Sequence, residues 1–305
     1  MKIVLILLQL LFFIVVAPFL SGLITKIKNR FRMRQGQSIF QPYYNLKKLF
    51  FKGEVVSETA SWIFKVAPFV LLASTLTVAL LVPVFIFSNP LYQMGDFLAL
   101  IFIFALGRFF LALAALDTGS SFGGMGSSRE MFISSLAEPA LCLAVFSVFL
   151  QFGSINIYVF SRMHGVSVAT LAAAVALFLV AIAETSRIPV DNQETHLELT
   201  MIHEAMILEY SGRSLALIEI SAQIKQMIWF FLIAQIIFPI TPLAIHSAGL
   251  FLWGLWYVAR IFIIVIIVSL LEVLVAKMRL FRAVDFLGFV FVLGIIASVC
   301  AILGV

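Results

Sequence analysis

Long apolar runs alternate with short polar connections along the whole chain. The first run covers residues 3–23, and the others fall at about residues 63–87, 97–116, 131–152, 166–186, 215–240, 248–272 and 285–304. Each is close to the roughly 20 residues that a helix needs to cross the hydrocarbon of a bilayer. Barrel strands would be only about 9–11 residues long with alternating polarity, so the pattern predicts helices. We therefore expect an all-α polytopic membrane protein of about eight transmembrane helices in a single domain, residues 1–305.

Composition supports the same class. The chain is 63% hydrophobic and only 11% charged, whereas about a quarter of the residues in a soluble domain are charged. Both cysteines, Cys142 and Cys300, lie inside apolar runs, which disfavours disulfides and metal–thiolate sites. The net charge is +5, and most Lys and Arg residues lie in a few connections between the runs. Their distribution indicates membrane topology and predicts no nucleic-acid partner.

Basic residues gather on alternate connections. Only Lys2 precedes the first run, whereas five basic residues follow it between Lys26 and Arg34. By the positive-inside rule, this asymmetry places both the N- and the C-terminus outside. The basic and aromatic segment that continues to about residue 61 is expected to lie as an amphipathic segment along the cytoplasmic membrane surface.

An acidic segment between the fifth and sixth runs, residues 183–212, is the most distinctive part of the chain. It reads AETSRIPVDNQETHLELTMIHEAMILEYSG and holds six of the fifteen acidic residues. Pro189 should end the incoming helix. A new helix is predicted from Asp191, with Asp191 and Glu194 as a capping box, to a stop at Gly212.

On such a helix the acidic and the other titratable residues separate. The acidic sector contains Asp191, Glu194, Glu198 and Glu209, and the opposite side carries His196, His203 and Tyr210. One interpretation is a solvated amphipathic loop helix. The flanking membrane spans favour another, in which the segment belongs to an ion pathway.

Several charged residues are embedded in the apolar runs. They are Arg108, Glu138, Glu184, Glu219, Lys225, Arg260 and Glu272. An unpaired charge at the bilayer centre costs about 2.5–3.5 kcal/mol, so most of these should pair or face polar cavities. Glu219 and Lys225 are six residues apart, which predicts partners on other helices. Lys225 is a candidate proton-exchanging lysine. Structural ion pairs or snorkelling side chains are the alternative for each.

Motifs for other chemistry are missing. The sequence has no phosphate-binding loop, dinucleotide fingerprint, C-x-x-C pair or H-E-x-x-H helix. The glycines of GGMG at 123–126 predict a tight turn. His203 and Glu204 lack a third ligand at suitable spacing, so no metal site is expected in this chain.

Several of these stretches together resemble a known family, the membrane subunit of respiratory complex I that adjoins its quinone chamber. They are AETSRIPVD at 183–191, LEYSG at 208–212, RQGQSIFQPYYNLKKLFFK at 34–52, and MGSSRE with AEP within 125–139. The stretches RFFLALAALDTGSSFGGMGSSRE at 108–130 and EVLVAKMRLFRAVDFLG at 272–288 are typical of the related subunit of energy-converting nickel–iron hydrogenases, the formate hydrogenlyase and hydrogenase-4 type.

The resemblance implies a non-catalytic subunit that anchors and couples an oxidoreductase complex in a bacterial or archaeal cytoplasmic membrane. Implied partners are hydrogenase-like large and small subunits, an iron–sulfur protein and antiporter-like membrane subunits. A NiFe centre and iron–sulfur clusters are expected in those partners, and no cofactor in this chain. By motif, the carried-over positions are Glu138, Glu184, Arg187, Asp191, Glu194, Glu198 and Glu209.

The full set of residues expected to couple ion movement adds further titratable positions, namely His196, His203, Glu204, Glu219, Lys225 and Glu272. Partner docking is expected at two of the quoted stretches, through Arg34, Gln41, Pro42, Tyr43, Lys47, Arg129 and Glu130.

Two departures from the complex I pattern favour the hydrogenase branch. His196 replaces a middle glutamate, and Asp191 and Glu209 are two residues further apart. Three alternatives stay open: a quinone-site subunit of an NADH–quinone oxidoreductase-like complex, a stand-alone secondary transporter, and a purely structural anchor. Against the transporter, the chain shows no pair of corresponding half-chains.

Overall fold

The computed structural model describes residues 2–83, 95–157, 167–191, 201–238 and 242–304. Their regular structure is helical apart from one isolated β-bridge between Asp96 and Asn156. The long helices are α1 (Lys2–Phe31), α3 (Trp62–Leu81), α4 (Phe97–Asp117), α5 (Ser121–Phe152), α7 (Val168–Glu184), α9 (Gly212–Ile237), α10 (Pro242–Leu274) and α11 (Leu280–Leu303). Two short helices, α2 (Gln41–Phe51) and α8 (His203–Ile207), lie in connections. The all-α membrane fold predicted from the sequence is confirmed.

Each predicted apolar run coincides with one long helix. Among the described residues, six helices are long and apolar enough to cross a membrane, and α7 is a shorter apolar helix of 17 residues. The number of spans and the side of each terminus stay predictions.

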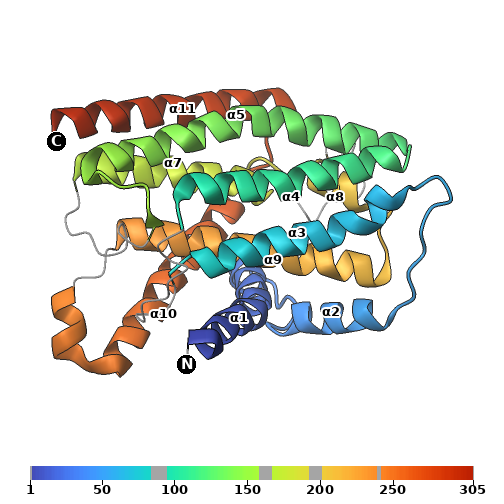
Figure 1. Cartoon of the computed structure of the whole chain (residues 1–305), viewed down its shortest axis with the longest axis horizontal. Helices are drawn as coiled ribbons and strands as arrows, with labels where there is room; N and C mark the ends of the chain where they lie inside the picture. Colours follow the sequence, from blue (N-terminus) through green and yellow to red (C-terminus); the bar gives the residue numbers. More distant parts are fainter. Residues whose placement is uncertain (1, 84–94, 158–166, 192–200, 239–241, 305) are drawn as a thin grey trace.

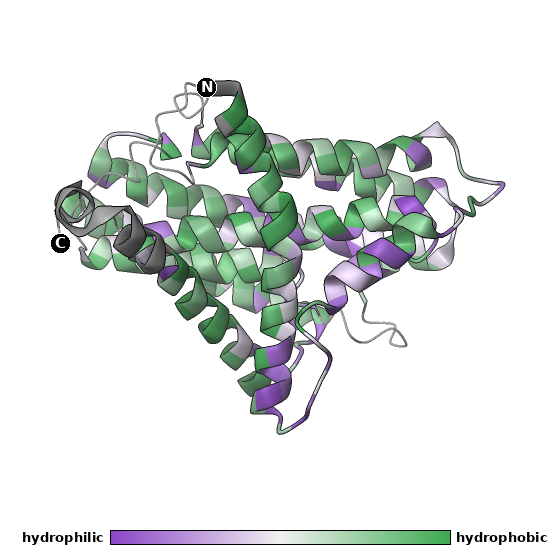
Figure 2. Ribbon diagram, turned by 90° about the horizontal axis from the view of Figure 1, so that it is seen from below, coloured by the Kyte–Doolittle hydropathy of each residue, from purple (hydrophilic) through white to green (hydrophobic). Residues whose placement is uncertain are grey.

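Most long helices lie side by side, and α1 crosses them. In Figure 1, α3, α4, α5, α7 and α11 run along the length of the molecule, whereas Figure 2 shows α1 crossing the bundle. The core between them contains small and branched residues such as Ala140, Ala144 and Val290. Because these side chains are small, α5 and α11 pack closely. The buried charged side chains within this bundle include Arg108, Glu184 and Glu272.

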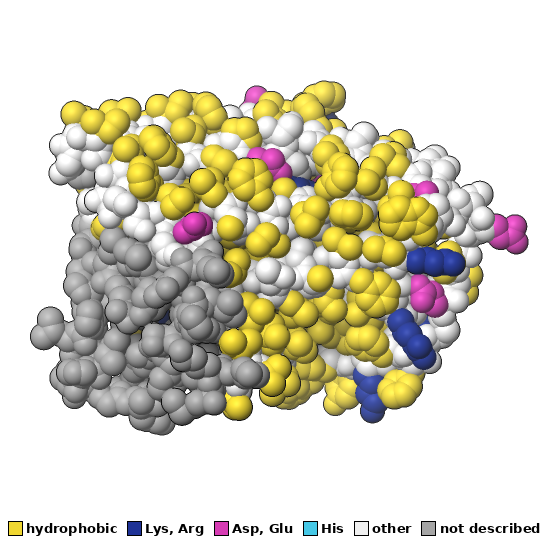
Figure 3. Space-filling view, viewed as in Figure 1, with side chains coloured by type: hydrophobic (Ala, Val, Ile, Leu, Met, Phe, Trp, Pro, Cys, Tyr) yellow, Lys and Arg dark blue, Asp and Glu magenta, His cyan; other side chains and the backbone are white. Residues whose placement is uncertain are grey.

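Hydrophobic side chains cover most of the described part of one face, and Lys and Arg gather at one end of it (Figure 3). The hydrophilic end of α1 and the polar α2 are seen in Figure 2. Pro42 stands in the first turn of α2, where the lost backbone donor costs nothing. On α2, Leu46 is buried and Lys47 is exposed, as expected for a helix that lies on a surface.

The predicted turn at 123–126 is wrong, because these glycines lie inside α5. Ser120 caps this helix by accepting a hydrogen bond from the Gly123 amide at 3.1 Å. A Cβ on Gly126 would lie 2.9 Å from the Cβ of Ala205, so the glycine allows α8 to approach α5. Close packing, not a turn, is the reason for glycine here.

The predicted helix from Asp191 to Gly212 is also not formed as expected. In the described part of this segment, only His203–Ile207 is helical, and Gly212 begins α9 instead of ending a helix. Gly212 has φ of 53°, and a Cβ there would lie 2.5 Å from the carbonyl oxygen of Gly53. The glycine is therefore required by a close approach of the segment before α3.

Candidate functional site

Glu184 is the centre of a buried ion-pair network. It is the last residue of α7, and a turn that leads to Pro189 follows it. Arg108 of α4 donates to its Oε1 at 2.5 Å, and Lys225 of α9 donates to its Oε2 at 2.8 Å. The Glu184 side chain is only 3% exposed, so both cations neutralise a carboxylate that water scarcely reaches. Such a charge persists in a membrane interior only when it is paired.

Two further contacts complete this part of the network. Arg108 also donates to Glu138 of α5, whose side chain is 39% exposed. The Lys225 ammonium lies 5.5 Å from the ring centroid of Phe104, within cation–π range. Glu138, Arg108, Glu184 and Lys225 thus connect four helices, α5, α4, α7 and α9.

A second part of the network surrounds Arg187, in the loop after α7. Arg187 donates to Glu272 of α10 at 3.0 Å and to Gln226 of α9 at 2.7 Å. Lys28 of α1 pairs with the other oxygen of Glu272 at 3.2 Å. Gln226 directly follows Lys225 on α9, so the two parts of the network meet at adjacent residues of one helix.

Asp191 fastens the end of the same loop. Its Oδ2 accepts from the amides of Ile202 and His203, at 3.2 and 3.1 Å, and so caps α8. Its Oδ1 accepts from Lys277 at 3.1 Å, and the Met278 amide donates to the Pro189 carbonyl at 2.9 Å. The connection between α10 and α11 therefore clamps the loop from the other side.

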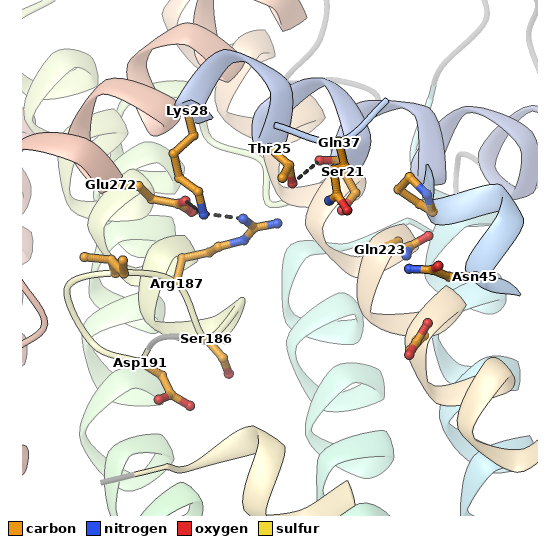
Figure 4. Close-up of a pocket in the computed structure, with 13 residues that line it drawn as sticks. Ser21, Thr25, Lys28, Gln37, Asn45, Ser186, Arg187, Asp191, Gln223 and Glu272 are labelled. Atoms are coloured by element: carbon orange, nitrogen blue, oxygen red, sulfur yellow. Dashed lines mark hydrogen bonds and ion pairs between the residues drawn. The ribbon is translucent and has the colours of Figure 1, made fainter. Parts of the chain in front are cut away.

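The network borders two cavities. The large cavity has a volume of about 440 Å³ and lies between α1, α2, α9 and the loop after α7 (Figure 4). The small cavity has a volume of about 50 Å³ and lies deeper between α3, α4, α5 and α9. Arg187, Asp191, Glu219 and Glu272 line the large cavity, and the small one is lined by Arg108, Glu130, Glu184, His203 and Lys225.

Electrostatics around α8 favour a neutral imidazole. Burial lowers the pKa of His203, although the carboxylates of Glu204 and Asp191 oppose the shift. Burial also raises the pKa of Glu204, against the opposing effect of His203. His203 lines the small cavity, and its backbone amide donates to Asp191, which lines the large cavity. The start of α8 therefore connects the two cavities.

Some predicted site residues lie elsewhere. Glu209 is exposed, and Tyr210 stacks on Phe64 and donates to its backbone carbonyl at 3.0 Å. The positions of Glu194, His196 and Glu198 lie outside the described residues. Among the described residues, the carboxylates of the site come from several elements, namely Glu138 of α5, Glu184 of α7, Asp191 of the following loop and Glu272 of α10.

Residues expected at a docking surface divide into two groups. Arg34 and Lys47 are exposed, and Gln41, Pro42 and Tyr43 are half-buried on α2, where Tyr43 donates to the Val15 carbonyl. Arg129 donates to the Met201 carbonyl at 3.1 Å, and Glu130 lines the small cavity. The second pair thus contributes to the interior of the site.

Sequence reasoning missed four contributors to the site. Arg108 stood out as an embedded charge but was not assigned to it, and Lys28 was read as part of a basic stretch, although it is buried. Ser186 and Gln226 carried no signal, because uncharged polar residues in apolar sequence are common. The six-residue spacing of Glu219 and Lys225 correctly predicted that Lys225 pairs with another helix.

Comparison with known proteins assigns the chain. A family profile described as NADH dehydrogenase matches residues 2–303. The chain belongs to the NADH dehydrogenase family. Within this family it is 32% identical over 288 residues to hydrogenase-4 component C of Escherichia coli K12, covering 92% of this chain and 90% of that one. It is 31% identical over 284 residues to formate hydrogenlyase subunit 4 of the same strain, with 90% of each covered.

One more distant relative and one solved structure also match. NADH-quinone oxidoreductase subunit 8 of Rhodothermus marinus is 28% identical over 228 residues, covering 68% of this chain and 64% of that one. A chain in the structure of the membrane-bound sulfane sulfur reductase, an archaeal respiratory membrane complex, superposes with a TM-score of 0.80. It covers 98% of this chain and 99% of that one at 18% identity, which shows a shared fold. The protein is thus a multi-pass membrane subunit whose relatives belong to respiratory membrane complexes.

Proposed function

We propose that this chain is the membrane anchor and coupling subunit of a hydrogenase-4 or formate hydrogenlyase-like complex. It links electron transfer in peripheral partner subunits to the movement of protons or sodium ions across the bacterial or archaeal cytoplasmic membrane. The observation that carries this proposal is the placement of Glu184, a buried carboxylate held by Arg108 and Lys225 from two other helices.

This arrangement suits a coupling element because its parts depend on one another. A charge that changes within about 4–6 Å of a carboxylate moves the pKa of that carboxylate by one to three units. Adding a charge beside Arg187 weakens or strengthens its pairing with Glu272, which also holds Lys28. Gln226, which accepts from Arg187, carries the change to the adjacent Lys225 on α9. The network thus converts a charge change at the large cavity into a changed protonation within the bundle.

The walls of the large cavity argue against the alternative of a quinone site. Of the thirteen described residues that line it, eleven are polar or charged, and Pro42 and Ile188 are the two exceptions. Sites for small organic ligands are lined mainly by hydrophobic and aromatic side chains. Such a wall suits water and ions better than a quinone ring, which favours the hydrogenase branch, where electrons end on protons.

We propose that metal chemistry belongs to the partner subunits, as the sequence resemblance implies. Within the described ranges, no three His, Cys, Asp or Glu side chains are grouped as a metal site requires. The proposed partners are hydrogenase-like large and small subunits, an iron–sulfur protein and antiporter-like membrane subunits. These would carry the NiFe centre and the iron–sulfur clusters.

Purification of the intact complex tests the partner assignment. The chain is tagged at one end, solubilised gently, and its co-purifying proteins are identified by mass spectrometry with nickel and iron assays. A nickel–iron protein with iron–sulfur and antiporter-like chains supports the proposal. Recovery of this chain alone, metal-free and able to transport ions in liposomes, contradicts it.

A further inference from the structure

Ser186 lies in the wall between the two cavities. Of the described residues that line the large and the small cavity, it is the one common to both. Its sequence neighbours divide between them, because Glu184 lines the small cavity and Arg187 lines the large one. Figure 4 shows Arg187 extending toward Thr25, whereas Ser186 points away from it. The loop after α7 therefore forms the partition between the two cavities, and Ser186 places a hydroxyl in this partition.

The backbone of Ser186 is unusual for a serine. Its φ is 51°, in the left-handed region that glycine and asparagine adopt more readily. The residue is 7% exposed, and its amide donates to the Ala183 carbonyl at 3.1 Å. Non-glycine residues held in this region are often found at functional sites. Among the described residues, no hydrogen bond engages its hydroxyl, which stays available to the cavities.

Titratable groups stand on both sides of this hydroxyl. The large cavity presents Asp191, Glu219 and Glu272 with the cations Lys28 and Arg187. The small cavity presents Glu130, Glu184 and His203 with the cations Arg108 and Lys225. Both sides can therefore donate and accept protons, but the partition separates them.

We propose that the Ser186 hydroxyl relays protons between the large and the small cavity. This role rests on the proposed coupling function and assigns one step of it to a residue. A proton arrives on the hydroxyl oxygen from a water in one cavity, and the original hydroxyl proton leaves to an acceptor in the other. The serine ends unchanged, and rotation of its hydroxyl resets it.

The size of the small cavity supports protons as the ion at this step. A volume of about 50 Å³ holds only a few water molecules, since each needs at least about 10–15 Å³. A sodium ion with its own hydration shell would not fit beside the cations Arg108 and Lys225, which would also repel it. Protons pass along hydrogen-bonded groups and need no such room.

The test compares four variants in the intact complex reconstituted into liposomes. Ser186→Ala removes the exchangeable proton, whereas Ser186→Cys keeps one on a side chain of nearly the same shape as serine. Ser186→Gly removes the hydroxyl and suits the positive φ, so it decides the question if the alanine variant does not assemble. Glu184→Gln reports on the coupling function itself. Proton uptake per electron pair is measured with a pH-sensitive dye during electron transfer from a low-potential artificial donor.

We expect the alanine and glycine variants to lose roughly tenfold or more in proton uptake per electron pair, because a positioned proton-transfer group contributes about 10²–10⁴-fold to its step. The cysteine variant should lie between them and the unmodified complex. Normal uptake in the glycine variant, with uptake lost in Glu184→Gln, would overturn the relay alone. A cysteine variant no better than alanine would overturn it too, and leave Ser186 a packing residue. Normal uptake in Glu184→Gln would overturn the coupling function.

Discussion

Nη1 of Arg187 lies 3.0 Å from Oε1 of Glu272, so that the loop after α7 is tied to the end of α10. The second carboxylate oxygen of Glu272 pairs with Lys28 of α1 at 3.2 Å. One buried carboxylate therefore holds two cations from two different elements. These three residues form one wall of the large cavity (Figure 4).

Substitution of Glu272 by Gln should destabilise the chain strongly. Lys28 and Arg187 would then lose the buried carboxylate that they share, and breaking a buried pair costs about 3–5 kcal/mol. Thermal unfolding of the purified complex, followed by loss of this chain from the assembly, measures the effect. Asp285→Asn, at an exposed position of α11, is the control and should change stability by no more than about 0.5 kcal/mol. Equal stability of the two variants would show that the pairs contribute nothing.

Asp191 should matter more as a cap than as a partner of Lys277. Asp191→Ala removes the acceptor for the amides of Ile202 and His203, and loss of a cap costs about 0.5–2 kcal/mol. Lys277→Met leaves that cap in place. Hydrogen exchange of a peptide covering α8 should therefore accelerate in the first variant by more than in the second. Faster exchange in the lysine variant would contradict the capping role.

The burial of His203 predicts that α8 becomes less stable as the pH falls. Burial lowers its pKa in the folded protein below the unfolded value of about 6.5, so the unfolded segment binds more protons between these two values. The contribution of neutral His203 to the stability of α8 is complete above the pKa of the unfolded segment, and it is lost as the pH falls below that pKa. Amide exchange in α8, corrected for intrinsic rates, should rise from about pH 8 to about pH 5.5. The rise should be reduced in His203→Gln, and an unchanged rise would assign it to another group.

Two glycines on α5 provide a matched steric comparison. A Cβ on Gly126 would lie 2.9 Å from the Cβ of Ala205 and 3.0 Å from the carbonyl of Ile202, whereas a Cβ on Gly124 would meet nothing within 4 Å. Gly126→Ala should destabilise the contact with α8 by about 1–3 kcal/mol. Gly124→Ala should be neutral or stabilise α5 by up to about 1 kcal/mol. Thermal unfolding of both variants checks the difference, and a destabilising Gly124→Ala would contradict the packing described here.

Apolar run length predicted nearly the whole helical fold, because a membrane span has to satisfy its own backbone hydrogen bonds and is therefore uniform in length and composition. The same rule says little about connections. Gly126 looked like a turn because sequence does not reveal that α8 packs against it. The capping box predicted at Asp191 stays a prediction, because Glu194 lies outside the described residues. The contacts of the Asp191 carboxylate with amides eleven and twelve residues away had no signal in the sequence, because they depend on how the chain returns to the loop.

The site residues that could be predicted from the sequence are the charged ones that lie inside apolar runs. Glu138, Glu184, Lys225 and Glu272 stood out because an unpaired charge in an apolar run is expensive, and the structure places each in a pair. Lys28 was hidden among neighbouring basic residues that are exposed or only partly buried. Pairing across helices depends on packing, so no spacing in the sequence indicates that Lys28 meets Glu272.

Glu184 gives the most direct test of coupling. The measurement is the number of ions moved per electron pair in liposomes that contain the intact complex, with proton and sodium uptake followed separately. Replacing Glu184 by Gln removes the charge that holds Arg108 and Lys225 together but keeps the shape of the side chain. We expect electron transfer to continue while ion movement per electron pair falls roughly tenfold or more, as for a lost proton-transfer group. An assembled Glu184→Gln complex that moves ions at the normal ratio would contradict it.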